Sequence, residues 1–198
     1  PDTIRHLPAW EQSRYWHYIS IDDHEQFSGL ERHSEGDLLS ALDYFYTQLQ
    51  NPDLDEREQR EALAFLIHFV ADVHQPLHVG NASDWGGNKI EVKWRSKKTN
   101  LHALWDSDML KSIGINYPSS LNSLLSEAAV ESDKNKPVIE WFNESLSLAR
   151  TNAYRDEKGN IIISGTSIGT GYIRRNQPVL IKRLVLAGER LARMLNDI

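Results

Sequence analysis

The chain has 198 residues, of which 40% are apolar and 25% are charged, so it fits one globular domain and is neither a disordered nor a fibrous protein. Its net charge of −6, from 22 basic and 28 acidic side chains, excludes binding of nucleic acid through a broad basic surface. The sequence contains no cysteine, so disulfides and thiolate ligands are excluded, and any metal must be held by histidine and carboxylate side chains.

The N-terminal half predicts two helices and a strand. Apolar residues recur at helical spacing from Leu38 to Leu49 and again from Glu56 to Val73, and a proline follows each segment. A turn-rich loop over residues 81–87 comes next. Strict alternation of polar and apolar side chains over residues 89–94 then predicts a strand, which we assign to a hairpin.

The C-terminal half predicts further helices. Short ones are expected over residues 101–112, 121–132 and 138–153. A long amphipathic helix is expected from Gly171 to Asn196. The expected architecture is therefore a single, mainly α domain over residues 1–198, with several helices and one small β-hairpin.

Two segments place a histidine and an aspartate four residues apart, which brings both side chains to one face of a helix. The pairs are His68 with Asp72 and His102 with Asp106, and His78 follows soon after the first pair. A single pair of this kind is more often a helix-stabilising contact than a metal site. Here both pairs lie among large apolar residues, and metal coordination offsets the cost of burying an unpaired carboxylate. Two such pairs and a third histidine favour a zinc site.

Three motifs carry a resemblance to a known family. They are HFVADVHQPLH from His68 to His78, the segment Gly86-Gly87-Asn88, and NLHALWDSDM around His102 and Asp106. The chain resembles the three-zinc, single-strand-specific nucleases, which are the type I nucleases and 3′-nucleotidases of fungi, plants and bacteria and are related to bacterial zinc phospholipase C. Further matches, which extend the resemblance over nearly the whole chain, lie at Asp2-x-x-Arg5, Trp16–Ile19 and Tyr172–Asn196.

The resemblance implies the multi-helix fold of zinc phospholipase C and the single-strand nucleases. It also implies a zinc-dependent endonuclease that hydrolyses single-stranded DNA and RNA to 5′-phosphorylated products, with 3′-nucleotidase activity. The expected partners are therefore single-stranded nucleic acid and nucleotides, as substrates. Zinc would bring to the phosphate the positive charge that the acidic chain lacks.

The resemblance implies three zinc ions. Two of them would be held by histidine and aspartate side chains, with Asp2, His17 and His68 for one zinc and His78, His102 and Asp106 for another. Asp72 would bridge the first zinc to a close neighbour. In the family that neighbour is completed by an N-terminal tryptophan and a histidine shortly after it, and neither is in this sequence. We therefore expect the N-terminal ligand segment to be absent and the third zinc site to be incomplete.

The resemblance also implies catalytic and substrate-binding residues. Asp2 would accept a proton from the attacking water and Arg5 would bind the phosphate, with an ion pair between the two residues as the alternative. The base would lie between Tyr18 and the segment Gly86-Gly87-Asn88, where Asn88 would hydrogen-bond a base edge. Tyr18 could equally be a core aromatic. Ser20 stands where the family has an aspartate, so the base contacts are expected to differ.

The other histidines and tryptophans are assigned no role in the reaction. The histidines expected to be solvent-facing or structural are His24, His33 and His74. The tryptophans expected in the core or at a rim, rather than as stacking platforms, are Trp10, Trp85, Trp94, Trp105 and Trp141.

Three other functions compete with this interpretation. A zinc phospholipase C would use the same metal cluster but would need exposed apolar loops nearby, whereas the loop here ends in Gly86-Gly87-Asn88. A phosphohydrolase of the HD type would have adjacent histidine and aspartate, and no histidine here directly precedes an aspartate. The third is an inactive metal-binding helical domain, which the zinc content would distinguish from the enzyme.

The expected location also rests on the resemblance. Family members are secreted, and eukaryotic ones usually carry disulfides, so a cysteine-free chain is expected to be a bacterial member that is periplasmic or secreted. No signal peptide is in this sequence. No apolar stretch approaches the ~18 residues that span a bilayer, and no protein partner is evident, so we expect a monomer that needs no membrane.

Overall fold

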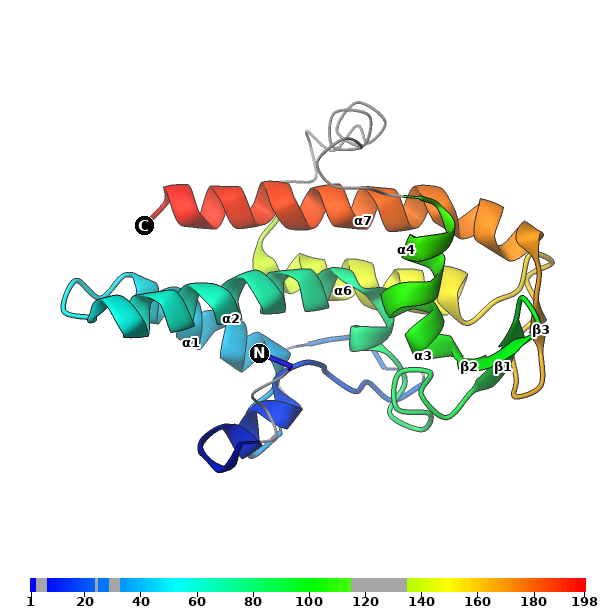
Figure 1. Cartoon of the computed structure of the whole chain (residues 1–198), viewed down its shortest axis with the longest axis horizontal. Helices are drawn as coiled ribbons and strands as arrows, with labels where there is room; N and C mark the ends of the chain where they lie inside the picture. The colour runs from blue at the N-terminus through cyan, green and yellow to red at the C-terminus, as the bar shows by residue number, and fades with distance from the viewer. Residues whose placement is uncertain (3–6, 24, 29–32, 115–134) are drawn as a thin grey trace.

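The computed structural model describes residues 1–2, 7–23, 25–28, 33–114 and 135–198. Its long helices lie side by side, with a small sheet at one end (Figure 1). The N-terminal segment lies on the side of α2 (Glu56–His74) opposite α7 (Thr170–Asn196). This arrangement confirms the expected mainly α fold.

Two capped helices form one edge of the molecule. α1 (Leu38–Leu49) and α2 match the predicted segments to within one residue. Asp37 caps α1 and Asp55 caps α2, each by accepting the backbone N–H three residues further on. The two helices pack through aromatic side chains, with the rings of Phe45 and Phe65 stacked 4.5 Å apart.

The proline after α2 turns the chain toward the cleft described below. Pro76 begins a short 3₁₀ helix, η2 (Pro76–Val79), which carries His78. The buried face of α2 includes Phe65 and Phe69. The apolar spacing from Glu56 to Val73 would also place Ile67 on this face, but its side chain is 45% exposed because the helical period puts it beside the buried stripe.

The helix predicted over residues 101–112 consists of three pieces. α3 (Leu101–Ala103) continues into a π-helical turn, η3 (Leu104–Asp108), and then into α4 (Met109–Ser112). Such π-turns are frequent at functional sites, and η3 carries Asp106.

The remaining helices follow the predicted pattern. α6 (Val138–Leu148) passes into a second π-helical turn, η4 (Ala149–Ala153), so that together they cover the predicted segment. α7 begins one residue before the predicted start and ends at the predicted residue. The helix expected over residues 121–132 lies outside the described residues.

The small sheet contains the predicted hairpin and one further strand. β1 (Glu91–Trp94) pairs antiparallel with β2 (Lys97–Asn100), and Arg95 and Ser96 form the turn with positive φ values of 45° and 64°. β3 (Ser167–Ile168) adds to β1 in parallel, giving the strand order β2-β1-β3. The sequence did not predict β3, because two residues are too few for alternation to be recognised.

Apolar side chains form two core clusters. One lies between α1, α2 and α6, and the other surrounds η3, η4 and the first half of α7. In the second, the buried Trp105 donates its indole N–H to the hydroxyl of Tyr172 (2.8 Å), which in turn donates to the carbonyl of Ala153 (2.8 Å). Since Trp105 directly precedes Asp106, these bonds fix the turn that carries that carboxylate.

A buried ionic network fastens the C-terminal end of α2. Arg183 on α7 donates from Nε to the carbonyl of His74 (3.0 Å), which satisfies one of the last carbonyls of α2. Glu144 on α6 accepts from Arg183 (2.6 Å) and from Arg190 (2.8 Å). Three helices are thereby joined at the turn of α2 that carries Asp72.

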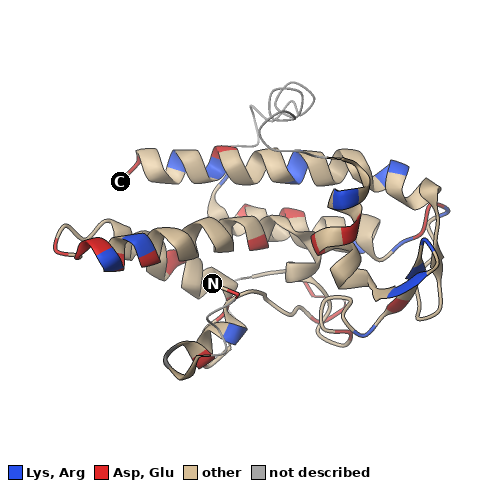
Figure 2. Cartoon of the chain, in the orientation of Figure 1, with Lys and Arg blue, Asp and Glu red and all other residues tan. Residues whose placement is uncertain are grey.

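The charged side chains are unevenly distributed over the described residues. Acidic and basic residues are mixed in the first turns of α2, whereas the charged residues of α7 are mostly basic, and basic residues also gather on the β1–β2 hairpin (Figure 2). None of the helices in the described ranges has both the length and the hydropathy of a membrane-crossing segment.

Candidate metal centre

Side chains from five segments meet at the wall of one cleft, which has a volume of about 1280 Å³. The wall includes Asp2 and His17 of the N-terminal segment on either side of η1 (Pro8–Tyr15), Asp72 of α2, His78 of η2, His102 of α3 and Asp106 of η3. His68 of α2 contacts His17 next to the cleft. The structure thus brings together all seven metal ligands expected from the sequence.

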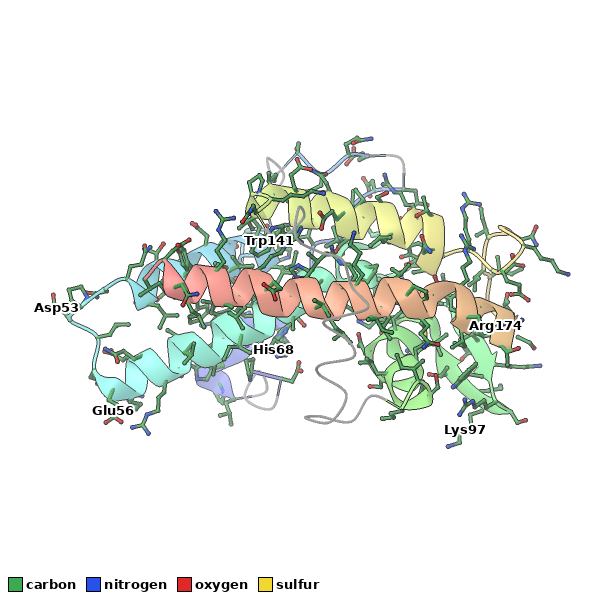
Figure 3. All side chains as sticks on the ribbon, turned by 90° about the horizontal axis from the view of Figure 1, so that it is seen from above. Asp53, Glu56, His68, Lys97, Trp141 and Arg174 are labelled. Atoms are coloured by element: carbon green, nitrogen blue, oxygen red, sulfur yellow. The ribbon has the colours of Figure 1, made fainter. Side chains whose placement is uncertain are left out.

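Asp2, His17 and His68 form the first group, and their candidate ligand atoms all lie within 4.8 Å of one another. His68 points from α2 toward the N-terminal segment (Figure 3), and its Nε2 lies 2.9 Å from His17 Nδ1. The Asp2 carboxylate oxygens lie 3.7 Å from His68 Nε2 and 3.9 Å from His17 Nδ1. His17 is buried, whereas the Asp2 side chain is 62% exposed, so the group opens to solvent at Asp2.

His78, His102 and Asp106 form the second group, within the same 4.8 Å limit. Asp106 places one carboxylate oxygen 3.5 Å from His78 Nε2 and the other 3.3 Å from His102 Nε2. The two imidazole rings are stacked, with centroids 4.9 Å apart. Both Nε2 atoms therefore face the same carboxylate.

Asp72 lies between the two groups. Its Oδ2 is 2.9 Å from His17 Nδ1 and 3.2 Å from His68 Nε2, while its Oδ1 is 3.4 Å from His78 Nδ1. Burial raises the pKa of Asp72, but the charge on His78 and the hydrogen bonds from His17 and His68 outweigh it and hold the pKa well below its usual range. The carboxylate is therefore ionised at neutral pH and carries negative charge into the centre of the site.

Backbone carbonyls orient the two imidazoles of the second group. His78 donates from Nδ1 to the carbonyl of His17 (2.6 Å), and His102 donates from Nδ1 to the carbonyl of Gly86 (2.7 Å). Because Nδ1 is held by the carbonyl, each ring turns its Nε2 toward Asp106, where a bound cation would take the place of a proton. A histidine that binds a metal usually donates its other ring N–H to such a carbonyl, which fixes the orientation of the ring.

The charges of the second group favour a cation. Burial lowers the pKa of His78, but the carboxylates of Asp72 and Asp106 outweigh it and raise the pKa to about 9. Burial and the charge on His78 lower the pKa of His102. One positive charge is therefore favoured between the two carboxylates. Two imidazole nitrogens and a carboxylate are also a donor set that zinc prefers, so the residues fit this metal.

Gln75 supports the second group and was not predicted from the sequence. Its Nε2 donates to Asp106 Oδ1 (2.7 Å), and its Oε1 accepts from the backbone N–H of Leu77 (2.6 Å). A glutamine at the end of a helix gives no signal of such a contact, because Asp106 lies 31 residues further along the chain.

The residues expected to bind substrate occupy different positions. Tyr18 is 41% exposed and lines the cleft together with Gly86 and Asn88, so the alternative that Tyr18 is a core residue is excluded. Gly87 is buried against the start of α3 and donates its N–H to Asp84 Oδ1 (2.6 Å). Arg5 lies outside the described residues.

The other histidines and tryptophans agree with their expected environments. His74 is buried, with Nδ1 2.7 Å from the carbonyl of Val70, while the exposed His33 stacks on Tyr15. His24 lies outside the described residues. Trp94, Trp105 and Trp141 are buried, Trp10 is half-buried, and Trp85 lies at the rim of the cleft.

Comparison with known proteins agrees with this geometry. The sequence profile of the family described as S1/P1 nuclease matches residues 1–198. The chain is 33% identical to Endonuclease 4 of Arabidopsis thaliana over 224 residues, which cover 100% of this chain and 74% of the relative. It is 28% identical to Nuclease S1 of Aspergillus oryzae over 220 residues, covering 98% of this chain and 75% of the relative. A shorter match to Nuclease P1 of Penicillium citrinum is 34% identical and covers 54% of this chain and 42% of the relative.

The profile match and the match to Endonuclease 4 extend over the whole chain and therefore include the seven side chains of the candidate metal centre, while the match to Nuclease S1 covers nearly all of it. The chain belongs to the S1/P1 nuclease family.

Proposed function

We propose that the protein is a zinc-dependent endonuclease that hydrolyses single-stranded DNA and RNA to 5′-phosphorylated products and also acts as a 3′-nucleotidase. The observation that carries this proposal is the meeting of two histidine–aspartate groups at one cleft, with Asp72 between them. Relatives that match over most of the chain are named as endonucleases and as Nuclease S1, which supports a hydrolase acting on phosphodiester bonds.

We assign the ligands as the resemblance implies. Asp2, His17 and His68 hold one zinc, and His78, His102 and Asp106 hold another. Asp72 contacts His17 and His68 of the first group, which suits the residue that, in the family, would be shared between the first zinc and the third. When bound, zinc would lower the pKa of a bound water to ~7 and neutralise charge on the phosphate.

The other side chains of the cleft have separate roles in proton transfer, in orienting the second group and in binding the phosphate. Asp2 is exposed at the opening of the first group, where it can take a proton from the attacking water. Gln75 and the carbonyls of His17 and Gly86 keep the second group in one orientation. Arg5 keeps the phosphate-binding role that the resemblance implies.

The cleft also gives a physical reason for single-strand preference. A phosphate within a stacked, paired duplex cannot reach ligands on the wall of a cleft without unpairing, whereas an unpaired strand can place its base on an aromatic surface. Tyr18 offers that surface beside His17, with Gly86 and Asn88 on the same cleft. The side-chain amide of Asn88 already donates to the carbonyl of Trp85 (2.9 Å), so its oxygen is left to accept from a donor on the base edge.

The acidic net charge is compatible with an anionic substrate. Because the cations of the cleft would supply the local positive charge, the rest of the surface needs no broad basic face. We further propose that the protein acts as a monomer after secretion or in the periplasm, as the resemblance implies.

Zinc content and substrate range test the proposal. The full-length protein should contain zinc and cleave single-stranded DNA and RNA faster than duplex DNA, and verified metal removal by a chelator should abolish cleavage. His102→Ala should reduce activity by at least about a hundredfold, since loss of a ligand or of its support costs this much in metal enzymes. Cleavage in the verified absence of zinc would refute the proposal. Hydrolysis of phosphatidylcholine instead of nucleic acid would favour the phospholipase alternative.

A further inference from the structure

The β1–β2 hairpin concentrates positive charge in an acidic protein. Residues 89–100 contain five basic side chains and one acidic side chain, whereas the whole chain has a net charge of −6. Four of the basic side chains lie on the hairpin itself and are exposed, and within the described part of the chain none of the four makes an ion pair. We call them the hairpin cations, and they are Lys93, Arg95, Lys97 and Lys98. Water or an external anion must therefore stabilise these charges.

The strand register places two of these lysines directly opposite each other. Lys93 on β1 pairs with Lys98 on β2, and Ser167 on β3 pairs with Lys93 on its other side. Paired residues point to the same face of a sheet, so two ammonium groups and a hydroxyl form a row across the exposed face. Like charges at directly opposite positions destabilise a hairpin. Local choices that cost stability are expected at functional sites, and here the function that suits the charges is binding of an anion.

The turn of the hairpin holds a third cation in a defined place. Arg95 and Ser96 form a two-residue turn with positive φ values, at positions where Asn and Gly are the usual residues. The guanidinium of Arg95 lies 4.8 Å from the ring centroid of Trp94, which is buried beneath the hairpin. The tip of the hairpin therefore presents its charge from a fixed position.

The hairpin connects directly to the second metal group. Asn100, the last residue of β2, caps α3 by accepting the backbone N–H of Ala103 (2.7 Å), so no loop separates the hairpin from His102. Four residues separate Lys98 from His102, which limits the distance between their Cα atoms to about 14 Å. A single strand whose scissile phosphate lies at the metal centre can therefore reach the hairpin within a few nucleotides.

The opposite end of the molecule is acidic. Residues 53–61, before and within the first turns of α2, contain five acidic and two basic side chains. Figure 3 shows Asp53 and Glu56 at the end of the molecule away from Lys97 and Arg174. The charge distribution therefore favours an anionic strand at the hairpin end.

We propose that the hairpin cations bind the phosphodiester backbone of single-stranded nucleic acid outside the cleft, so that the protein favours long strands over dinucleotides. The inference rests on the proposed nuclease function. Because these cations contact phosphates rather than base edges, the preference is for length and not for base sequence. A local patch is compatible with the acidic net charge, since salt screens each charge beyond a Debye length of ~8–10 Å.

The salt dependence of KM for the full-length zinc enzyme tests this surface. Lys93→Gln/Lys98→Gln removes two charges and should not lower Tm, because it also removes a like-charge pair. With a single-stranded DNA of about 20 nucleotides, the double variant should lower the slope of log KM against log salt by about 1.4, which is 0.7 for each lost phosphate contact. The ratio of its KM to that of the wild type should therefore fall about sevenfold between about 50 and 200 mM salt. KM for a dinucleotide should change less than about twofold.

A chimeric strand makes the test specific for phosphate charge. In a DNA of the same length, one phosphodiester is flanked by neutral methylphosphonate linkages, and on it the wild type and the double variant should have the same KM. Arg57→Gln/Arg60→Gln is the matched control, because it removes two exposed cations from the opposite end of the molecule. This control should keep the salt slope of the wild type.

Three outcomes would overturn the proposal. The first is an equal effect of the double variant on the dinucleotide and the long strand, and the second is an unchanged salt slope. The third concerns a lipid surface, because Ile161 and Ile163 are also exposed on the segment that joins β1 at Glu91. It is the loss of binding to phosphatidylglycerol vesicles in the double variant with unchanged cleavage of the long strand. A wild type that cleaves neither substrate would instead refute the nuclease function itself.

Discussion

Asp72 contacts histidines of both groups in the metal centre, which makes it the residue whose charge should affect the largest number of metal ions. Asp72→Asn preserves the size of the side chain but removes the negative charge that screens two neighbouring cations. We expect this variant to lose at least one zinc and nearly all cleavage of single-stranded DNA. Asp106→Asn should release the zinc of the second group and leave the first group intact.

Zinc stoichiometry and cleavage, measured for both variants in the full-length protein, check this expectation. The assignment of Asp72 as the bridge is wrong if Asp72→Asn keeps all its zinc while Asp106→Asn loses more than one ion.

Gly86 is the second residue on which the site depends. It has φ +59°, and a Cβ there would overlap the carbonyl oxygen of Leu77, so Gly86→Ala must displace the loop whose carbonyl orients His102. We expect a loss of roughly 3 kcal/mol in the free energy of unfolding and weaker zinc binding, measured by urea unfolding and metal titration. Gly159→Ala is the control, since Gly159 has φ +87° with no atom near its Cβ position. Gly159→Ala should lower the free energy of unfolding by about 1–2 kcal/mol and leave zinc binding unchanged. Equal zinc affinity in both variants would contradict the role of Gly86.

The sequence predicted the ligands of the site but not their supports. His68 with Asp72 and His102 with Asp106 were recognisable because helical spacing and apolar neighbours are local properties. Gln75 and the carbonyl of Gly86 contact the site only because segments distant in the chain fold together, and no local pattern encodes those contacts.

At the scale of the elements, the C-terminal end of α2 is held in place through Glu144, a carboxylate on α6. Burial raises the pKa of Glu144, but hydrogen bonds from Arg190 and Lys136 and the charges of Arg190 and Arg183 outweigh it and lower the pKa to about 2. The stabilisation by Glu144 is therefore fully present above its unfolded pKa near 4.5 and is lost as the pH falls toward 2.

Glu144→Gln tests this linkage. At pH 7 the variant should lose roughly 3 kcal/mol in the free energy of unfolding. The difference in this free energy between the variant and the wild type should disappear as the pH falls from 4.5 to about 2. Chemical unfolding over this pH range measures it. Glu11→Gln, which changes an exposed carboxylate paired with Arg14, should be close to neutral at every pH. A difference between Glu144→Gln and the wild type that does not vary with pH would show that packing, not charge, accounts for the loss.

The sequence predicted the bounds of long elements better than those of short ones. α1, α2 and α7 have several turns, so their apolar periodicity located them to within one residue. β3 is too short to have a period, and the π-turns η3 and η4 read as ordinary helix because one extra residue in a turn hardly changes the apolar spacing.

At the scale of the whole molecule, the residues of the metal centre come from segments that belong to both core clusters. Its ligands come from the N-terminal segment, α2, η2, α3 and η3. The unfolded chain has no such assembled set, so zinc binding adds directly to the free energy of unfolding. Free zinc at a thousand times its Kd would contribute about 4 kcal/mol per site.

We therefore expect zinc removal to lower Tm by about 10 °C or more, and magnesium not to restore it, because magnesium prefers oxygen ligands. Zinc removal should first destabilise only the segments that carry the ligands. Hydrogen exchange should increase over residues 7–23 and 101–112, which contribute His17 and the second His/Asp pair. It should change little in α6 and the middle of α7, which the network of Glu144 and Arg183 holds without any metal. An unchanged Tm after verified zinc removal would contradict a structural contribution of the metals. A uniform rise in exchange would instead indicate that the site and the core unfold as one unit.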